Sequence, residues 1–340
     1  MIGHCVLFVS YLFSYIYKTG FPCTHISPFY LTAESIRSST LPLSDRLLVL
    51  AVTVTASQVD TSLYSLSSKE AAFFKAQIGI DDDEDLKRHI LEVQAKAYKL
   101  APYPWIRGFI FILVNISSNP VYEHILKLGR ERPDAVLLDI GFGIDARKAA
   151  ADGFPAKNII ASDIHNVNPF HMLELSHELF KTTPASYPAC QIPGDVLDPE
   201  FLSVAAPLDD VSPAPATDFS SLKSLNPLRG RISAINVTRF FHLFPEDKQL
   251  HLARTLVGLL SAQPGSAICG HQVGKAEKGI SIVLVHVMGS EHRTLAHSPE
   301  SWRSMWRGVR EGHCKGRSGV SGFSLHGKTL TKMRWSVMRL

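Results

Sequence analysis

The stretch VLLDIGFGID, residues 136–145, holds an acid and two glycines where a buried strand would end. Its apolar run leads to Asp139, and Gly141 and Gly143 follow with one residue between them. Glycine at such a turn lets the backbone approach a ligand closely, because no Cβ stands in the way. A dinucleotide turn would have a third glycine where Ala146 stands, and the Asp139 carboxylate would repel a diphosphate. The pattern therefore favours a cationic or zwitterionic ligand.

Two further acids stand where later strands of the same kind would end. KNIIASD ends at Asp163, about twenty residues after Gly143, where an acid binds a ribose diol in this architecture. GDVLD contains Asp195, which could accept a hydrogen bond from the exocyclic amine of adenine. Each acid alone is more commonly a helix cap or a turn former. Three of them at the ends of successive strands favour an adenosine pocket.

These acids require strands that end at one edge of a sheet, and the chain after Ala135 alternates between strand and helix patterns. We expect strands at 135–140, 157–163, 189–198, 231–237, 265–273 and 331–340, and helices at 144–153, 170–180 and 245–261. Such alternation implies parallel strands joined by right-handed crossovers. The sequence thus predicts an α/β fold with a doubly wound, Rossmann-like sheet, which binds ligands at the carboxyl ends of its strands.

The region before this alternation has the pattern of several helices. SSKE resembles a capping box, with Ser67 or Ser68 as the cap of a helix that runs through Lys75. The acidic run DDDED opens a second helix, in which four apolar residues recur at helical spacing, namely Leu86, Ile90, Val93 and Ala97. We expect further helices at 106–115 and 121–128. The predicted division leaves 1–60 unassigned, with 61–130 as an N-terminal helical lobe and 131–340 as the ligand-binding domain.

Composition excludes several classes of protein. A hydrophobic fraction of 45% with 19% charged residues is too apolar for a disordered chain. A net charge of +4 is too small for a nucleic-acid binder with a basic stripe. The five cysteines form no CxxC pair, so we expect neither a disulfide framework nor a zinc site, and a cytoplasmic setting fits. The apolar run at 5–17 is shorter than the roughly 20 residues of a membrane-spanning helix, so no stable membrane insertion is expected.

Several segments of the chain resemble class I S-adenosylmethionine-dependent methyltransferases. They are LLDIGFGIDARKAAADG, IIASDIH, GDVLD, FFHLFPEDKQLHLARTLVGLLSAQPGSAICGHQVG and HSPESWRSMW. The nearest likeness is to the fungal group of meroterpenoid and other secondary-metabolite O-methyltransferases, and it covers residues 64–340. The likeness implies a methyltransferase sheet with an N-terminal helical lobe and S-adenosylmethionine as cofactor. It also implies a small-molecule substrate that is largely apolar and is methylated at a carboxylate.

The resemblance also implies roles for individual residues. The implied cofactor residues are Asp139, Gly141 and Gly143 at the methionine part, Asp163 at the ribose, Asp195 at the adenine and Val196 beside the adenine ring. The chain departs from the family at Phe142, where a small residue is usual, and at Ser233, where an acid is common. The stretches 279–293 and 315–328 fit the family poorly and are interpreted as gene-model errors.

The chemistry of methyl transfer narrows the catalytic requirement. The reaction is an in-line displacement, so the protein chiefly supplies alignment and electrostatics. A carboxylate acceptor, with a pKa of about 4, is already ionised at neutral pH and requires no base, whereas a hydroxyl acceptor does. His242 in RFFHLF is the candidate catalytic base, and a structural histidine packed beside phenylalanines is the alternative.

Four residues are candidates for contact with the substrate, namely Tyr103, Trp105, Arg107 and Phe241. The first three form an aromatic and basic cluster that could cover the pocket and pair with an acidic substrate. Helix packing is the alternative for this cluster, and a place in the core is the alternative for Phe241. Two other functions stay open, a catalytically inactive methyltransferase-like binding protein and, with less support, a dehydrogenase.

Overall fold

The computed structural model describes residues 60–100, 104–141, 144–163, 169–208, 218–285, 290–309, 314–325 and 328–340. Asp60–Val283 and His292–Leu340 form one compact unit, which contains every strand of the main sheet. None of the helices in the described ranges has both the length and the apolar character that crossing a membrane requires.

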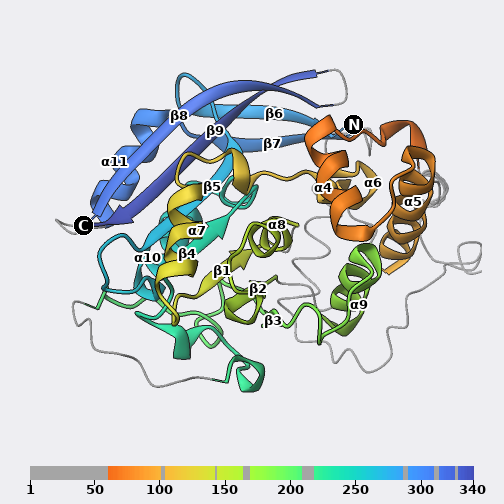
Figure 1. Ribbon diagram of the computed structural model, residues 1–340. Coiled ribbons are helices and arrows are strands. Elements are labelled where there is room, and N and C mark those ends of the chain that lie inside the picture. Colours follow the sequence, from red (N-terminus) through yellow and green to blue (C-terminus); the bar gives the residue numbers. More distant parts are fainter. Residues whose placement is uncertain are drawn as a thin grey trace, which may run out of the picture. The chain divides into compact units, whose positions relative to one another are not determined.

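A seven-stranded sheet forms the centre of this unit (Figure 1). Its strand order is β3-β2-β1-β4-β5-β9-β8, and the strands are β1 (Leu137–Ile140), β2 (Ile159–Ser162), β3 (Cys190–Gln191), β4 (Ala234–Val237), β5 (Ala267–Val273), β8 (Cys314–Leu325) and β9 (Lys328–Arg339). The five strands β3, β2, β1, β4 and β5 are parallel to one another, while β9 is antiparallel to β5 and to β8. From β1 the chain adds β2 and β3 on one side, and then crosses to the other side of β1 to add β4 and β5. This change of direction is what makes a sheet doubly wound, so the predicted fold is confirmed.

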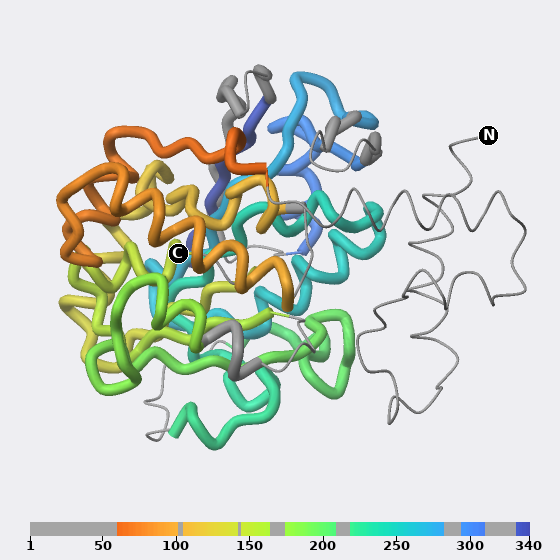
Figure 2. Tube along the Cα trace, turned by 90° about the vertical axis from the view of Figure 1, so that its right-hand side faces the viewer, coloured from red at the N-terminus to blue at the C-terminus, as the bar shows by residue number. Residues whose placement is uncertain are grey.

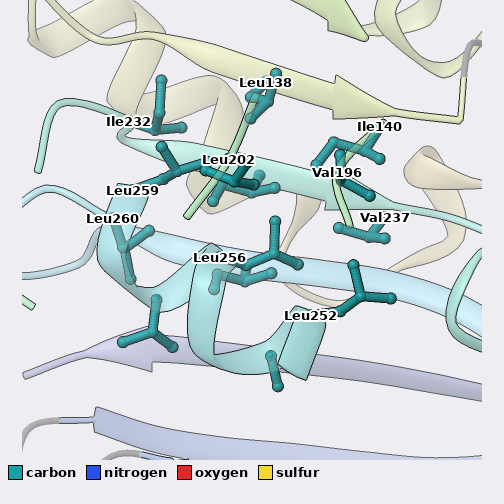
Figure 3. Close-up of a cluster of buried hydrophobic side chains, with 14 of the residues drawn as sticks. Leu138, Ile140, Val196, Leu202, Ile232, Val237, Leu252, Leu256, Leu259 and Leu260 are labelled. Carbon is teal, nitrogen blue, oxygen red and sulfur yellow. The ribbon is translucent and has the colours of Figure 1, made fainter. Parts of the chain in front are cut away.

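Helices cover both faces of the sheet, because each strand buries side chains in both directions. On one face, α7 (Tyr122–Glu131) and α8 (Asp145–Ala151) share an apolar cluster with Leu137 and Ala234. On the other face, α10 (Glu246–Leu259) packs on alternate residues of the same strands. Figure 3 shows this second cluster, in which Leu252, Leu256 and Leu259 lie against Leu138, Ile140 and Val237.

Four aromatic side chains fill the same core beneath α11 (Pro299–Val309). Trp302 and Trp306 lie one helical turn apart and pack on the sheet, as their spacing predicts. Their rings meet those of Trp335 on β9 and Phe241, with centroids 5.0–6.1 Å apart. Edge-on contacts of this kind add about 0.5–1.5 kcal/mol per pair beyond the apolar area that they bury.

The N-terminal helices match the predicted ones in part. Helix α4 (Ser68–Ile78) begins with the predicted capping box, in which Ser67 and Glu70 bond each other's backbone. Helix α5 (Asp83–Leu100) buries the four predicted apolar positions. The predicted helix at 106–115 is wrong. Only α6 (Pro104–Arg107) and two 3-10 turns (Ile110–Ile112 and Ile116–Ser118) form there, because Phe109 adopts a left-handed φ of +56°.

Helix α9 (Pro169–Phe180), which follows β2, fixes this lobe to the rest of the unit. The rings of Phe73 and Phe74 lie 5.9 and 5.5 Å from that of Phe180. Lys96 of α5 forms an ion pair with Glu178 of α9. The orange lobe and the green α9 therefore lie side by side (Figures 1 and 2).

The later part of the chain differs most from expectation. The strand predicted at 189–198 is reduced to β3, because the chain turns at Asp195, whose carbonyl accepts the Asp198 N–H at 2.9 Å. The stretch interpreted as a gene-model error forms β6 (Gly279–Val285) and part of β7 (Ser290–Ala296), which pair as a two-stranded sheet. The predicted last strand is confirmed as β9, and β8 pairs with it along its whole length.

Gly270 in β5 allows close packing of β4 on β5. A Cβ at this position would lie 2.1 Å from the Val237 carbonyl oxygen, so Gly270→Ala forces the two strands apart. We expect the free energy of unfolding to fall by about 1–3 kcal/mol, measured by urea titration. Gly308→Ala in α11 is the matched control, since a Cβ there meets no heavy atom within 4 Å. An unchanged urea midpoint for Gly270→Ala would contradict this packing.

Candidate active site

The three acids predicted at strand ends lie at the carboxyl edge of three neighbouring strands. Asp139 lies in β1, Asp163 directly follows β2, and Asp195 follows β3. Beyond the strands, the Gly141 N–H donates to the Ser162 carbonyl at 3.0 Å. The Gly194 N–H donates to the Asp163 carbonyl at 2.9 Å. The parallel register therefore continues past the strand ends and holds the loops that carry the acids next to one another.

Position 141 requires a glycine because of its backbone conformation, and not because a side chain would lack space there. Its φ is +91°, a value that L side chains rarely adopt. A Cβ added there would meet Phe240 at 3.5 Å and the Thr238 carbonyl at 3.7 Å, both ordinary contacts. Phe142 and Gly143, the other residues of this turn, lie outside the described residues.

The remaining predicted cofactor residues lie in different surroundings. The Asp163 side chain is half-buried. Asp195 is also half-buried, and its Oδ1 accepts the Leu197 N–H at 2.8 Å, so it forms a turn as well. Val196 is buried in the core cluster, where it lies beside Ile140 (Figure 3). Ser233 lies directly before β4, at the amino end of the strand, and its hydroxyl accepts the Val136 N–H. This departure from the family is therefore at the opposite end of the sheet from the acidic edge, the carboxyl edge that carries Asp139, Asp163 and Asp195.

Asn236 of β4 is a central residue of this edge that sequence analysis missed. Its Nδ2 donates to Asp139 Oδ1 at 2.7 Å and to Asp145 Oδ2 at 3.3 Å. Asp139 and Asn236 are register partners on adjacent strands, so their side chains leave the same face of the sheet. Nothing near Asn236 in the sequence indicates this role, because β1 and β4 become neighbours only in the folded sheet.

Asp145, at the start of α8, connects the acidic edge to the N-terminal lobe. Its Oδ1 accepts the backbone N–H groups of Asn115 and Ile116 at 2.7 and 3.0 Å. Burial raises the pKa of the Asp145 carboxyl, although these hydrogen bonds and that from Asn236 act in the opposite direction. The carboxylate thus fixes the loop between α6 and α7 to the start of α8.

Basic side chains lie around this connection. Lys332 of β9 donates to Asn115 Oδ1 at 2.9 Å, and burial lowers its pKa to about 8. Arg239, two residues after β4, has a left-handed φ of +57°, and its N–H donates to the His271 carbonyl. Burial lowers the pKa of His271 to about 2, so this imidazole is neutral throughout the physiological range.

The predicted substrate and catalytic residues are spread over separate elements. Trp105 on α6 is 37% exposed, and Arg107 on the same helix is half-buried. Tyr103 lies outside the described residues. Phe241 is fully buried among the tryptophans of α11 and β9, so it belongs to the core. His242 is half-buried in a 3-10 turn, where its carbonyl accepts the Thr294 hydroxyl.

The carboxylates at this edge match the groups that S-adenosylmethionine presents. This ligand carries a sulfonium, an ammonium, a ribose diol and an adenine amine, all of which favour carboxylate neighbours. The edge offers Asp139 within β1 and carboxylates after β2 and β3, and the left-handed Gly141 follows β1 directly. The residues present therefore fit this cofactor. Among the residues that the structure describes, no three His, Cys, Asp or Glu side chains gather in a group that could hold a metal ion.

Comparison with known proteins finds similarity to fungal methyltransferases. A family model described as the meroterpenoid methyltransferase N-terminal domain matches residues 60–112. O-methyltransferase phiE of a fungal species is 28% identical over 228 residues, which cover 66% of this chain and 66% of that protein. The Asnovolin E/Chermesin D methyltransferase nvfJ of Aspergillus novofumigatus is 28% identical over 229 residues, covering 66% of this chain and 70% of nvfJ. The chain thus spans about two thirds of the length of these relatives.

Methyltransferase ausD of Aspergillus calidoustus is 26% identical over 227 residues, covering 65% of this chain and 69% of that protein. A solved structure of 1,6-didemethyltoxoflavin-N1-methyltransferase from Burkholderia thailandensis has a TM-score of 0.40 and 10% identity, covering 74% of this chain and 89% of that one. The matched N-terminal domain corresponds to the lobe formed by α4, α5 and α6. Residues 60–112 thus match a meroterpenoid methyltransferase N-terminal domain, and the chain is similar to fungal methyltransferases at 26–28% identity.

Proposed function

We propose that this chain is an S-adenosylmethionine-dependent O-methyltransferase of a small hydrophobic secondary metabolite. The proposal rests on Asp139, Asp163 and Asp195, which lie at the carboxyl ends of three neighbouring parallel strands, with the left-handed Gly141 directly after the first of them. When bound, the cofactor supplies an electrophilic methyl group. In this proposal Asp163 accepts hydrogen bonds from the ribose hydroxyls and Asp195 from the adenine amine. Asp139 faces the methionine part, and Gly141 presents its backbone to it.

The proposed acceptor is a carboxylate on an otherwise apolar molecule. Such a group is ionised at neutral pH, so the protein needs only to align it and exclude water. Arg107 supplies a cation for this alignment, and Trp105, partly exposed on the same helix, supplies an apolar surface, together with Tyr103. The family description refers to meroterpenoids, which supports an apolar acceptor. The proposed compartment is the cytoplasm, and Cys190 and Cys269 are free thiols.

Asp163→Ala tests the cofactor assignment. Loss of the acceptor for two ribose hydroxyls should weaken the binding of S-adenosylhomocysteine at least tenfold, because each hydrogen bond to a charged group contributes about 1.5–3 kcal/mol. Isothermal titration calorimetry of the wild type and the variant measures this directly. Asp134→Ala is the matched control, since Asp134 is exposed at the opposite, amino end of β1. Equal affinity of Asp163→Ala and wild type would remove Asp163 from the site, and binding of NADH instead would overturn the methyltransferase proposal.

His242→Ala distinguishes the two acceptor classes. With a carboxylate acceptor no base is required, so kcat should change less than about threefold. With a hydroxyl acceptor, loss of the base should lower kcat by about 10²–10⁴-fold while S-adenosylhomocysteine still binds normally. Methyl transfer from labelled cofactor to a panel of apolar acids and phenols provides the measurement. Absence of turnover on every acceptor, with normal cofactor binding, would favour the inactive binding protein.

A further inference from the structure

Two buried carboxylates share a single amide at the acidic edge. Asp139 is 2% exposed, Asp145 is 4% exposed, and Asn236 between them is 1% exposed. The two hydrogens of the Asn236 amide are directed at one oxygen of each carboxylate, at 2.7 and 3.3 Å. Two carboxylates this close cannot both ionise cheaply unless donors compensate them. Asn236 is the donor common to both.

The orientation of this amide is set by its other end. Asn236 Oδ1 accepts the Thr238 hydroxyl at 3.0 Å and the Cys269 thiol at 3.8 Å. Both partners are donors toward this oxygen, so the NH₂ group must face the carboxylates. Cys269 is the register partner of Asn236 on β5, which makes the arrangement a polar row across three adjacent strands.

Other ionisable groups also face the pair. Lys332 of β9 and Arg239 after β4 lie near Asp145 and favour its ionised form. Cys269 on β5 faces both carboxylates, and burial keeps its thiol protonated by raising its pKa. Tyr122 of α7 faces Asp145, and Tyr187, before β3, faces Asp139. The Asn236 amide is therefore one of several groups that act on this pair, and it is the one that bonds both carboxylates.

We propose that Asn236 is a positioning residue, which holds Asp139 ionised beside Asp145 and fixes its orientation toward the cofactor edge. The effect of Asn236 on the two carboxylates does not depend on the proposed function. The effect of Asn236 on cofactor binding does rest on the proposed function, because that function assigns Asp139 to the cofactor. Asn236 acts through Asp139 in this proposal and needs no contact with substrate or cofactor.

Removal of the amide has a definite effect on the pH dependence of stability. Without it, the folded pair retains a proton to higher pH, whereas the unfolded carboxyls keep pKa values near 3.9. A group whose pKa is raised in the folded state loses stability as pH rises through that pKa, because the folded state then binds more protons than the unfolded state. Asn236→Ala should therefore be more destabilising at neutral pH than at acid pH.

The first test measures urea unfolding of the cofactor-free protein at pH 5 and pH 8. We expect the destabilisation by Asn236→Ala, expressed as the change in the unfolding constant, to be at least tenfold larger at pH 8 than at pH 5. Asn119→Ala is the matched control. Asn119 is also buried, at 4% exposure, but its amide donates to the carbonyls of Gly270 and Trp335. Its effect should be the same at both pH values.

Asn236→Ser keeps the test decisive if Asn236→Ala does not fold, because a serine hydroxyl still donates to one carboxylate. The same pH dependence, reduced in size, is expected for it. Adding Asp145→Asn to either variant should reduce the dependence, since the repulsion between the two carboxylates is then removed. Equal destabilisation at both pH values, as for Asn119→Ala, would overturn the proposal and leave Asn236 with a packing role.

The second test titrates S-adenosylhomocysteine into wild type and Asn236→Ala between pH 5 and pH 8. The affinity of both proteins should fall as the pH is lowered. We expect the midpoint of this fall to lie at least one pH unit higher for the variant than for wild type. Superimposable pH profiles would show that Asn236 does not position Asp139 for binding. If the wild type does not bind at any pH, the proposed function fails, while the urea experiment still decides whether Asn236 controls the carboxylate pair.

Discussion

The hydrogen bonds that compensate Asp139 and Asp145 are the constraint on which the site depends, because a buried charge costs several kcal/mol unless donors surround it. Those donors come from distant parts of the chain. Asn236 is 97 residues from Asp139, the Asn115 N–H belongs to the N-terminal lobe, and Lys332 of β9 bonds Asn115 from 217 residues away. The two carboxylates therefore have all of these partners only when the lobe, β4 and β9 are in place. The geometry of the candidate site thus depends on completion of the fold.

The alternation of side chains along the strands separates the site from the core. On β1 and β4, Leu138 and Val237 face α10 and the tryptophans, whereas Asp139 and Asn236 face α8 and the lobe. The same alternation on β5 and β9 places Cys269 opposite Ser336, which extends the polar row toward the basic side chains. Beyond the end of β4 the chain divides in a similar way. Arg239 lies near Asp145, while Phe241 turns into the aromatic core.

Local patterns in the sequence predict much of this structure, and long-range pairing explains the remainder. The strand ends that carry Asp139 and Asp163, the capping box of Ser67 and the apolar face of α5 depend on near neighbours, so their residues reveal them. The role of Asn236 depends on a neighbouring strand, and the loss of helix at 110–115 depends on an acid thirty residues later that takes the backbone N–H groups. Strands β6, β7 and β8 were not predicted, because pairing with a partner strand rather than a local pattern defines them.

The tryptophans divide the protein into two optical environments. Three of the four, Trp302, Trp306 and Trp335, form one buried group with ring centroids 5.0–5.9 Å apart. At this separation they exchange excitation energy and report as one emitter on the integrity of the core beneath α11. Trp105, the fourth, is partly exposed on α6 in the matched N-terminal domain. Its long-wavelength emission is therefore a separate signal, which reports events at the lobe while the core emission stays constant.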